Sequence, residues 1–107
     1  MRKLWIDDLR PAPGEEWVIA RTSAEAIAEL ERAAVAGIRF DEIGFDHDLG
    51  KLEDGTLDES KAVMYWLCEN EDQWPAKIVI HTSNPEGRKW LRGTAKRYAP
   101  EGTIVIG

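Results

Sequence analysis

With 107 residues, 43% of them hydrophobic and 32% charged, the chain has material for one domain over residues 1–107 and too much apolar content for intrinsic disorder. Its net charge of −6 argues against strong non-specific binding to nucleic acid, and its longest apolar run, of seven residues, is too short to cross a membrane. A single cysteine excludes an intramolecular disulfide, so we expect a reduced, cytoplasmic domain without a signal peptide.

The first part of the chain predicts two strands and a helix. Lys3–Ile6 and Trp17–Ala20 are short apolar runs typical of buried strands, and the Pro-rich connector between them, residues 9–16, cannot be helical. Thr22 then begins a capping-box pattern in front of an Ala- and Leu-rich stretch with helical spacing. Gly37 is a suitable C-terminal stop for that helix.

The middle of the chain predicts a third strand and a second helix. The strand ends at Ile43–Phe45 and is followed by a polar loop over residues 49–55. Residues Thr56–Glu59 form a second capping box, which predicts a helix that starts there and ends before Trp74. The inner face of this helix is expected to carry Val63, Trp66 and Leu67.

Two further strands with a helix between them complete the expected elements. Lys77–Ile80 predicts the fourth strand, and Asn84 followed by Pro85 predicts the N-cap and the first residue of the third helix. Thr103–Ile106 predicts the fifth strand. The inner face of the third helix is expected to carry Trp90, Leu91, Ala95 and Tyr98.

This order of strands and helices favours an α/β domain. The strands lack a clean alternation of polar and apolar residues, which is typical of strands buried on both faces of a parallel sheet between layers of helices. The connector Asp7–Glu16 has only ten residues, fewer than the roughly twelve that a parallel crossover normally uses. Fully extended, it reaches about 33 Å against roughly 17 Å for a strand, so a parallel pair is feasible and a hairpin is the alternative.

Acidic side chains follow the first and third predicted strands. In an open parallel sheet the carboxyl ends of the strands share one edge, where ligands bind, so these side chains are expected to meet in one crevice. A bound Mg²⁺, which prefers oxygen ligands and accepts a phosphate oxygen, would offset the mutual repulsion of the carboxylates. Each aspartate alone could instead be a helix-cap or turn residue. The sequence predicts a magnesium site from Asp7, Asp8, Asp46 and Asp48.

Both histidines of the chain, His47 and His81, follow predicted strands at this same edge. An imidazole exists in either protonation state near neutral pH, so the pair could act as general acid and base beside a catalytic Asp46. Hydrogen-bonded supporting roles for both rings are the alternative. The expected phosphate-binding groups at this edge are Thr82, Ser83, Asn84, Arg88 and Arg10.

Basic residues are concentrated toward the end of the chain. Residues 1–76 carry 8 basic and 18 acidic side chains, whereas residues 77–107 carry 6 basic and 2 acidic ones. This asymmetry indicates either the solvated face of one helix or a lip that attracts anions beside the acidic crevice. The basic residues concerned are Arg88, Lys89, Arg92, Lys96 and Arg97.

Three segments resemble the receiver domains of bacterial response regulators. Ile6–Asp8 is similar to the acidic pair after their first strand, Ile43–Asp46 to the third strand with its phosphoacceptor aspartate, and Ile78–Thr82 to the fourth strand with its switch residue. The resemblance implies a single three-layer domain whose five-stranded, mostly parallel sheet has the receiver and flavodoxin-like order 2-1-3-4-5. The Pro-rich connector replaces the first receiver helix, the fifth strand lacks the receiver Lys-Pro, and no final helix follows before Gly107.

The segments Asp7–Pro11, Phe45–Gly50 and His81–Gly87 resemble more specifically the cyclic-phosphate-processing receiver-like family. The resemblance implies a small phosphoesterase that opens a nucleotide 2′,3′-cyclic phosphate or an ADP-ribose cyclic phosphate, in RNA repair or conflict systems. It implies that His47 and His81 handle the cyclic phosphate while the aspartates organise metal or water. The partner would then be a phosphate-containing small molecule or an RNA end, with no membrane involved.

Two other functions stay open from the residues alone. One is a non-catalytic pseudo-receiver that binds Mg²⁺, a phosphorylated ligand or a protein, supported by the receiver-like acidic set and Thr82 without the receiver lysine. The other is an adaptor or inhibitor whose acidic surface acts as a decoy. Its only support is the net charge of −10 over residues 1–76.

Overall fold

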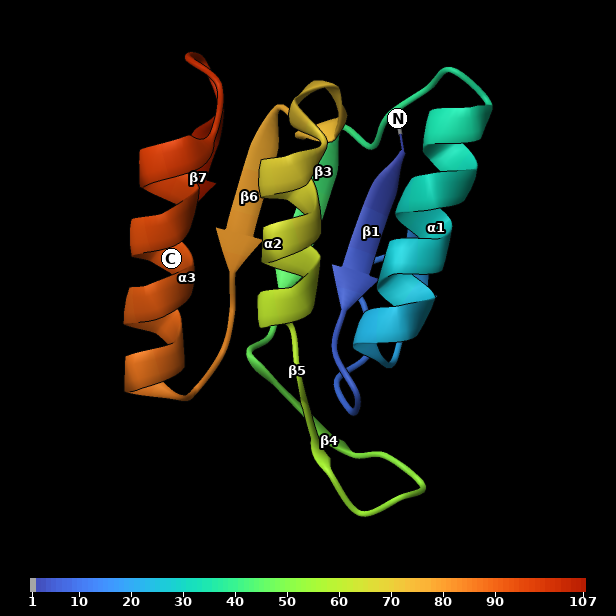
Figure 1. Cartoon of the computed structure of the whole chain (residues 1–107), viewed down its shortest axis with the longest axis vertical. Coiled ribbons are helices and arrows are strands. Elements are labelled where there is room, and N and C mark those ends of the chain that lie inside the picture. Colours follow the sequence, from blue (N-terminus) through green and yellow to red (C-terminus); the bar gives the residue numbers. More distant parts are fainter. Residues whose placement is uncertain (1) are drawn as a thin grey trace.

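The computed structural model describes residues 2–107 (Figure 1). Its five-stranded sheet contains β1 (Lys3–Ile6), β2 (Trp17–Ala20), β3 (Glu42–Phe45), β6 (Lys77–Ile80) and β7 (Ile104–Ile106). A separate hairpin contains β4 (Asp48–Lys51) and β5 (Leu57–Glu59). The helices are α1 (Ser23–Val35), α2 (Lys61–Glu69) and α3 (Pro85–Tyr98), with a 3₁₀ turn, η1 (Glu71–Gln73), after α2.

Neighbouring strands of the five-stranded sheet are parallel, in the order β2-β1-β3-β6-β7. Because β6 and β7 are the predicted fourth and fifth strands, the expected order and the receiver-like α/β domain are confirmed. Leu4 of β1 lies beside Val18 of β2 and Ile43 of β3. The connector between β1 and β2 therefore does span the length of a strand, and the alternative hairpin is excluded.

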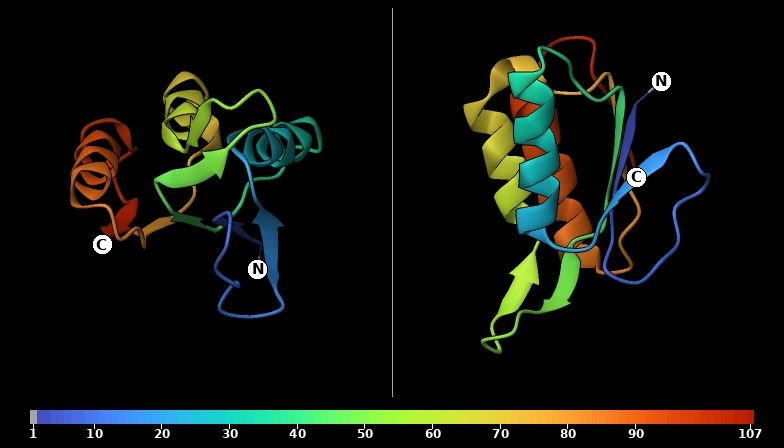
Figure 2. Two further views of the ribbon diagram at one scale, coloured as in Figure 1. Left: turned by 90° about the horizontal axis from the view of Figure 1, so that it is seen from below. Right: turned by 90° about the vertical axis from the view of Figure 1, so that its right-hand side faces the viewer.

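The helices α1, α2 and α3 lie side by side on one face of the sheet, and the connector between β1 and β2 lies on the other side (Figure 2). The described residues thus form two layers rather than the expected three. The strand order gives the reason. The helical connections all run in one direction across the sheet, from β2 toward β7, and right-handed crossovers in one direction place their helices on one face. The connection from β1 to β2 runs the opposite way and contains no helix.

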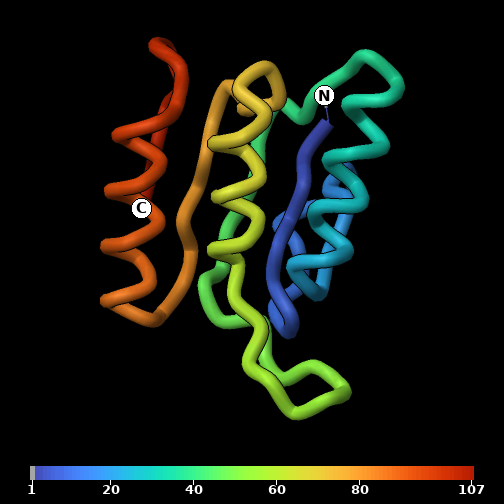
Figure 3. Tube along the Cα trace, in the orientation of Figure 1, coloured from blue at the N-terminus to red at the C-terminus, as the bar shows by residue number. Residues whose placement is uncertain are grey.

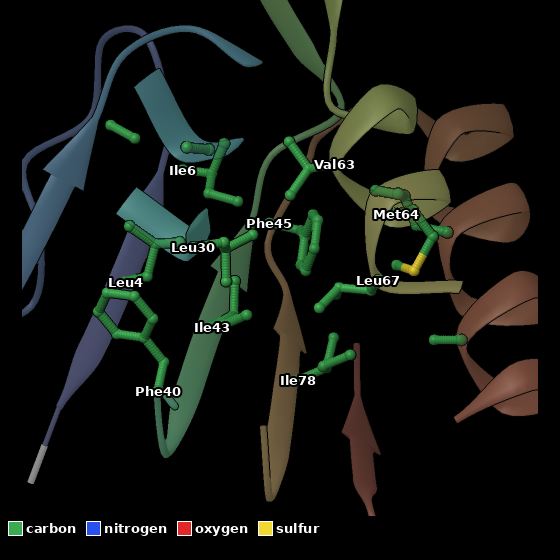
Figure 4. Packing of buried hydrophobic residues seen from close by; sticks show 14 of the residues in the cluster. Leu4, Ile6, Leu30, Phe40, Ile43, Phe45, Val63, Met64, Leu67 and Ile78 are labelled. Carbon is green, nitrogen blue, oxygen red and sulfur yellow. The ribbon is translucent and has the colours of Figure 1, made fainter. Parts of the chain in front are cut away.

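The hydrophobic core lies between the sheet and this helical layer. Alternate strand residues point toward the helices (Figure 4), where burial of apolar surface contributes roughly 25 cal/mol per Å². Fully buried members of the core are Leu4, Ile6, Leu30, Ile43, Phe45, Val63, Met64, Leu67, Ile78 and Leu91.

Two of the predicted helix starts and one predicted end are confirmed. The Thr22 hydroxyl accepts a hydrogen bond from the amide of Glu25, and Asn84 Oδ1 accepts one from the amide of Gly87. Gly37 follows the end of α1 with a φ of 73°, the left-handed conformation that a helix stop of this kind requires. Local capping signals therefore place both ends of α1 and the start of α3.

The helix start predicted at Thr56 is wrong, and the loop expected over residues 49–55 is confirmed only for residues 52–55, because residues 49–51 belong to β4. These residues belong to the β4–β5 hairpin, which projects beyond the carboxyl edge of the sheet (Figure 3), and α2 begins only at Lys61. The buried carboxylate of Asp58 explains the difference. It accepts hydrogen bonds from the amide and hydroxyl of Ser23 at 2.8 and 2.6 Å, so it ties β5 to the N-terminus of α1.

The inner faces of α2 and α3 differ from expectation, and both tryptophans expected there, Trp66 and Trp90, are only partly buried. Met64 is fully buried in α2, whereas Trp66 is only partly buried. Tyr98, at the end of α3, is 54% exposed, whereas the next residue, Ala99, packs against the core. Among the described residues, the helices are too short or too polar to cross a membrane.

Candidate functional site

Three carboxylates meet at the carboxyl edge of the sheet, where β1 and β3 end. One oxygen from each of Asp7, Asp8 and Asp46 lies within 4.8 Å of the others, a separation suited to one bound cation. An open cavity of about 330 Å³ lies over them, and we call it the acidic pocket. All four predicted metal ligands line this pocket, because Asp48 also reaches it. The other lining residues are Leu9, Arg10, Gly50 and Ser83.

Asp7 is the buried member of this group, with 1% of its surface exposed. Its Oδ1 accepts hydrogen bonds from the amides of Leu9 and Arg10, both at 2.9 Å, which fix the turn after β1. Its Oδ2 is buried and has no hydrogen-bond donor among the described residues. A buried carboxylate oxygen without a donor is costly unless a cation or water satisfies it, so the pocket fits a hard cation such as Mg²⁺.

Asp46 lies at the end of β3 in a less buried position. Burial raises the pKa of its carboxyl, a hydrogen bond from Thr82 lowers it, and the negative charge of Asp7 raises it again. Its Oδ1 also accepts a hydrogen bond from the amide of His47 at 2.9 Å. The pKa of Asp46 is raised overall, which means that the pocket disfavours this second negative charge. A bound cation would remove the penalty.

His81 follows β6 and lies on the side of the sheet away from the helices. Its ring stacks on Trp5, with 3.9 Å between the ring centroids and 8° between the planes. Its Nδ1 is 3.5 Å from Oδ2 of Asp7. Burial lowers the pKa of the imidazole, and the carboxylates of Asp7 and Asp46 oppose this effect only in part. His81 is therefore neutral at pH 7 and able to accept a proton.

His47 lies on the other side of the sheet, against α3. Its ring packs on Gly87, where any Cβ atom would overlap it. Its Nδ1 is 3.1 Å from Oδ1 of Asp48, and its Nε2 is 3.9 Å from Oε2 of Glu59. These three side chains form a second group that could hold a cation, again within 4.8 Å of one another. Within residues 2–107, no hydrogen bond or ion pair joins the two histidines.

The register of the sheet explains why the histidines diverge. Phe45 and Ile80 are partners in β3 and β6, and both point toward the helices. His81 is one residue beyond Ile80 and turns to the opposite face, whereas His47 is two residues beyond Phe45 and stays on the helical side. This difference of one position is visible in the sequence. The contact of Glu59 with His47 could not be predicted from the sequence, because the segment that contains Glu59 carries a helix-start signal.

The expected phosphate-binding residues after β6 have different roles. Thr82 is 1% exposed, and its hydroxyl accepts a hydrogen bond from the amide of Asn84 at 3.2 Å. Asn84 Nδ2 donates to Oδ2 of Asp48 at 3.0 Å, while its Oδ1 caps α3. Both side chains are thus engaged within the protein. Ser83, between them, is exposed and lines the acidic pocket.

Arg10 and Arg88 bind consecutive carbonyl groups at the end of β6. Arg10 Nη1 donates to the carbonyl oxygen of His81 at 2.7 Å, and Arg88 Nη2 donates to that of Thr82 at 2.5 Å. Both side chains are exposed, and of the two only Arg10 lines the acidic pocket. A guanidinium has five N–H donors, so each side chain keeps donors for an anion.

Residues 2–97 match the family model described as the cyclic-phosphate processing Receiver domain. The matched range extends from β1 to Arg97 in α3 and includes every residue of the acidic pocket, whereas β7 lies outside it. No curated protein and no solved structure gives a significant match to the chain.

Proposed function

This chain belongs to the family of cyclic-phosphate processing receiver domains, and we propose that it hydrolyses a cyclic phosphate ester in the acidic pocket. Nucleotide 2′,3′-cyclic phosphates and ADP-ribose cyclic phosphate are the two substrate classes that suit this chemistry. The observation that carries the proposal is the 3.5 Å contact between His81 and Asp7, beside a carboxylate cluster in an open cavity. A neutral imidazole beside a carboxylate is a suitable base for activating water.

A cation is part of the proposal, because a cyclic phosphate is an anion and the bare carboxylates would repel it. Asp7, Asp8 and Asp46 would hold Mg²⁺. The fit rests on their hard oxygen donors and on the unpartnered Oδ2 of Asp7. When bound, the ion would supply Lewis-acid polarisation of the phosphate and neutralise its charge.

His81 would take a proton from the attacking water, and Asp7 would stabilise the imidazolium that forms. Stacking on Trp5 fixes the plane of the imidazole ring. Water adds to phosphorus, one ring P–O bond breaks, and the departing oxygen takes the proton from the imidazolium and stays on the sugar as a hydroxyl. Ser83 and Arg10, both exposed and both lining the pocket, would bind the phosphoryl oxygens.

His47 has a positioning role in this proposal. Neither histidine ring lines the acidic pocket, but the ring of His81 contacts Asp7 of the carboxylate cluster. The ring of His47 is instead buried against Gly87 and contacts Asp48 and Glu59. Its Nδ1 lies 3.1 Å from the carboxylate of Asp48, which does line the pocket. We therefore assign proton transfer to His81 and the orientation of Asp48 to His47, in place of the acid–base pair that the sequence suggests.

Hydrolysis of 2′,3′-cyclic AMP and of ADP-ribose cyclic phosphate in the presence of MgCl₂, followed by ³¹P NMR, tests the proposal. We expect turnover that EDTA abolishes and that His81→Gln reduces by about 10²- to 10⁴-fold. His47→Gln is the matched variant and should reduce turnover much less. The proposal is wrong if wild type and His81→Gln have equal rates, or if neither substrate is turned over with Mg²⁺ or Mn²⁺.

A receiver-like signalling role is the second candidate, and one arrangement favours it. Asp46, in the position that resembles the phosphoacceptor, accepts a hydrogen bond from Thr82 and lies beside Asp7 and Asp8. Incubation with acetyl phosphate, followed by intact-mass measurement, separates the two candidates. A stable phosphoryl adduct that Asp46→Asn abolishes supports signalling, whereas turnover of a cyclic phosphate supports the enzyme.

A further inference from the structure

A groove lined by cations runs along the exposed side of α3. This helix lies at the outer edge of the helical layer (Figure 1). The volume of the groove is about 630 Å³, against about 330 Å³ for the acidic pocket. We call it the α3 groove. Its charged lining residues are Arg88, Lys89, Arg92 and Lys96.

The four cations form one stripe because of the helical repeat. Positions 88, 92 and 96 recur every four residues, with 89 beside them, so the side chains project from the same face of α3. No acidic side chain lines the groove. Within residues 2–107, no ion pair engages Lys89, Arg92 or Lys96. Their charges are therefore available to an anionic ligand.

The stripe is longer than one phosphate group. From Arg88 to Lys96 it extends about 12 Å, at 1.5 Å per helical residue. Gly93 lies in the middle of the groove, and a Cβ atom at this position would meet no atom within 4 Å. Packing gives no reason for a glycine here, although glycine in a helix costs about 1 kcal/mol relative to alanine. The absent side chain leaves the centre of the groove open.

The α3 groove and the acidic pocket share one lining residue. Ser83 lines both cavities, and α3 begins two residues later. Arg88, which binds the carbonyl oxygen of Thr82, lines the groove, while Arg10 binds the preceding carbonyl from the side of the acidic pocket. Ser83 and the two arginines therefore place the groove next to the acidic pocket.

We propose that the α3 groove binds the phosphodiester backbone of a single-stranded oligonucleotide whose terminal 2′,3′-cyclic phosphate occupies the acidic pocket. The identity of the terminal group rests on the proposed function, but the binding of the backbone does not. Guanidinium and ammonium groups in a row match successive phosphates. ADP-ribose cyclic phosphate or a mononucleotide would leave the cations of α3 unused, so the groove favours an RNA end as substrate.

Fluorescence anisotropy with 5′-fluorescein-labelled hexauridylate that ends in a 3′-hydroxyl tests the backbone contact without any hydrolysis. The double variant Arg92→Glu/Lys96→Glu should weaken binding by at least about 10-fold and reduce the slope of log K against log salt by about 1.4, for two lost phosphate contacts on a single strand. The matched control is Arg39→Glu/Arg97→Glu, which has the same net charge but changes residues that do not line the groove. It should change affinity by less than about threefold.

Equal losses in the two double variants would overturn the proposal, because binding would then depend on net charge alone. Unchanged affinity in Arg92→Glu/Lys96→Glu would overturn it as well. A further test is a competition experiment in which inorganic polyphosphate of six units competes with hexauridylate for the protein. If polyphosphate displaces hexauridylate at an equal concentration, the groove takes any polyanion and the assignment to an oligonucleotide is wrong.

Kinetics separate this proposal from the hydrolysis on which it partly rests. With a tetranucleotide that ends in a cyclic phosphate, Arg92→Glu/Lys96→Glu should raise KM by about 10-fold and leave kcat unchanged, with no effect on 2′,3′-cyclic UMP. If wild type binds hexauridylate through α3 but hydrolyses neither substrate, the proposed hydrolysis fails and the groove stands. If 2′,3′-cyclic UMP is hydrolysed but KM for the tetranucleotide does not change in the variant, the groove fails.

Discussion

The aspartates around the acidic pocket occupy unequal environments, although they look alike in the sequence. The pKa of Asp46 is raised, mainly by burial, whereas the pKa of Asp48 is lowered. Burial is the largest single effect on the pKa of Asp48, and it raises that pKa. Hydrogen bonds from Asn84 and His47, together with the charge of His47, lower the pKa and outweigh burial. The fold therefore disfavours ionised Asp46 and favours ionised Asp48.

Asp46→Asn should stabilise the metal-free protein, because the amide removes a negative charge that the pocket disfavours. At pH 7 in EDTA we expect its melting temperature, measured by differential scanning fluorimetry, to exceed that of wild type. Asp48→Asn is the matched control and should lower the melting temperature. MgCl₂ should then raise the melting temperature of wild type and have little effect on Asp46→Asn.

The stabilisation by Asp46→Asn should also depend on pH. Between the ordinary value of 3.8 and the raised pKa of Asp46, the folded chain binds more protons than the unfolded chain. The contribution of Asp46 to stability therefore falls as the pH rises through that window. The difference in melting temperature between variant and wild type should be largest near neutral pH and disappear below the ordinary pKa. A difference that is independent of pH would contradict this account of Asp46.

At the scale of the element, α3 contains two glycines with opposite surroundings. Gly93→Ala should raise the free energy of unfolding by about 1 kcal/mol, because alanine restricts the unfolded backbone and its methyl group meets no atom within 4 Å. Gly87→Ala in the same helix should lower that free energy, since its methyl group would overlap the ring of His47. Urea unfolding followed by tryptophan fluorescence measures both. A loss of stability in Gly93→Ala would show that the centre of the α3 groove is filled.

Local signals predicted those elements whose ends depend on local hydrogen bonds. The caps at Thr22 and Asn84 use only amides of their own helices, and both lie where the sequence places them. The signal at Thr56 failed because a capping box does not exclude a strand. The outcome there depends on Asp58, whose carboxylate binds Ser23 at a separation of 35 residues. A short sequence motif cannot predict contacts between residues that lie so far apart along the chain.

The candidate site was predictable to the extent that a parallel sheet gathers strand ends at one edge. Asp7, Asp8 and Asp46 meet because β1 and β3 are neighbours. The contact of His47 with Glu59 depends on the β4–β5 hairpin, and the stacking of His81 depends on packing across three strands. Neither follows from the residues next to the histidines.

At the scale of the whole molecule, the sheet has one face packed against helices and one that is largely open. Trp5 and Trp17 cover the β1–β2 part of the open face, with their ring centroids 5.5 Å apart. Apolar side chains of both edge strands remain exposed on this face. They are Ile19, Ile104 and Ile106, which are 44%, 56% and 46% exposed.

A two-layer domain makes a specific prediction about β6 and β7, which are neighbours in the sheet. Ile104→Lys should change the free energy of unfolding by no more than about 0.5 kcal/mol, because the side chain points away from the helices into solvent. Ile78→Ala is the comparison: Ile78 is fully buried under the helices, and its truncation should cost about 2–5 kcal/mol. Urea unfolding at equal protein concentration measures both variants. If Ile104→Lys destabilises as much as Ile78→Ala, something covers the open face and the two-layer description fails.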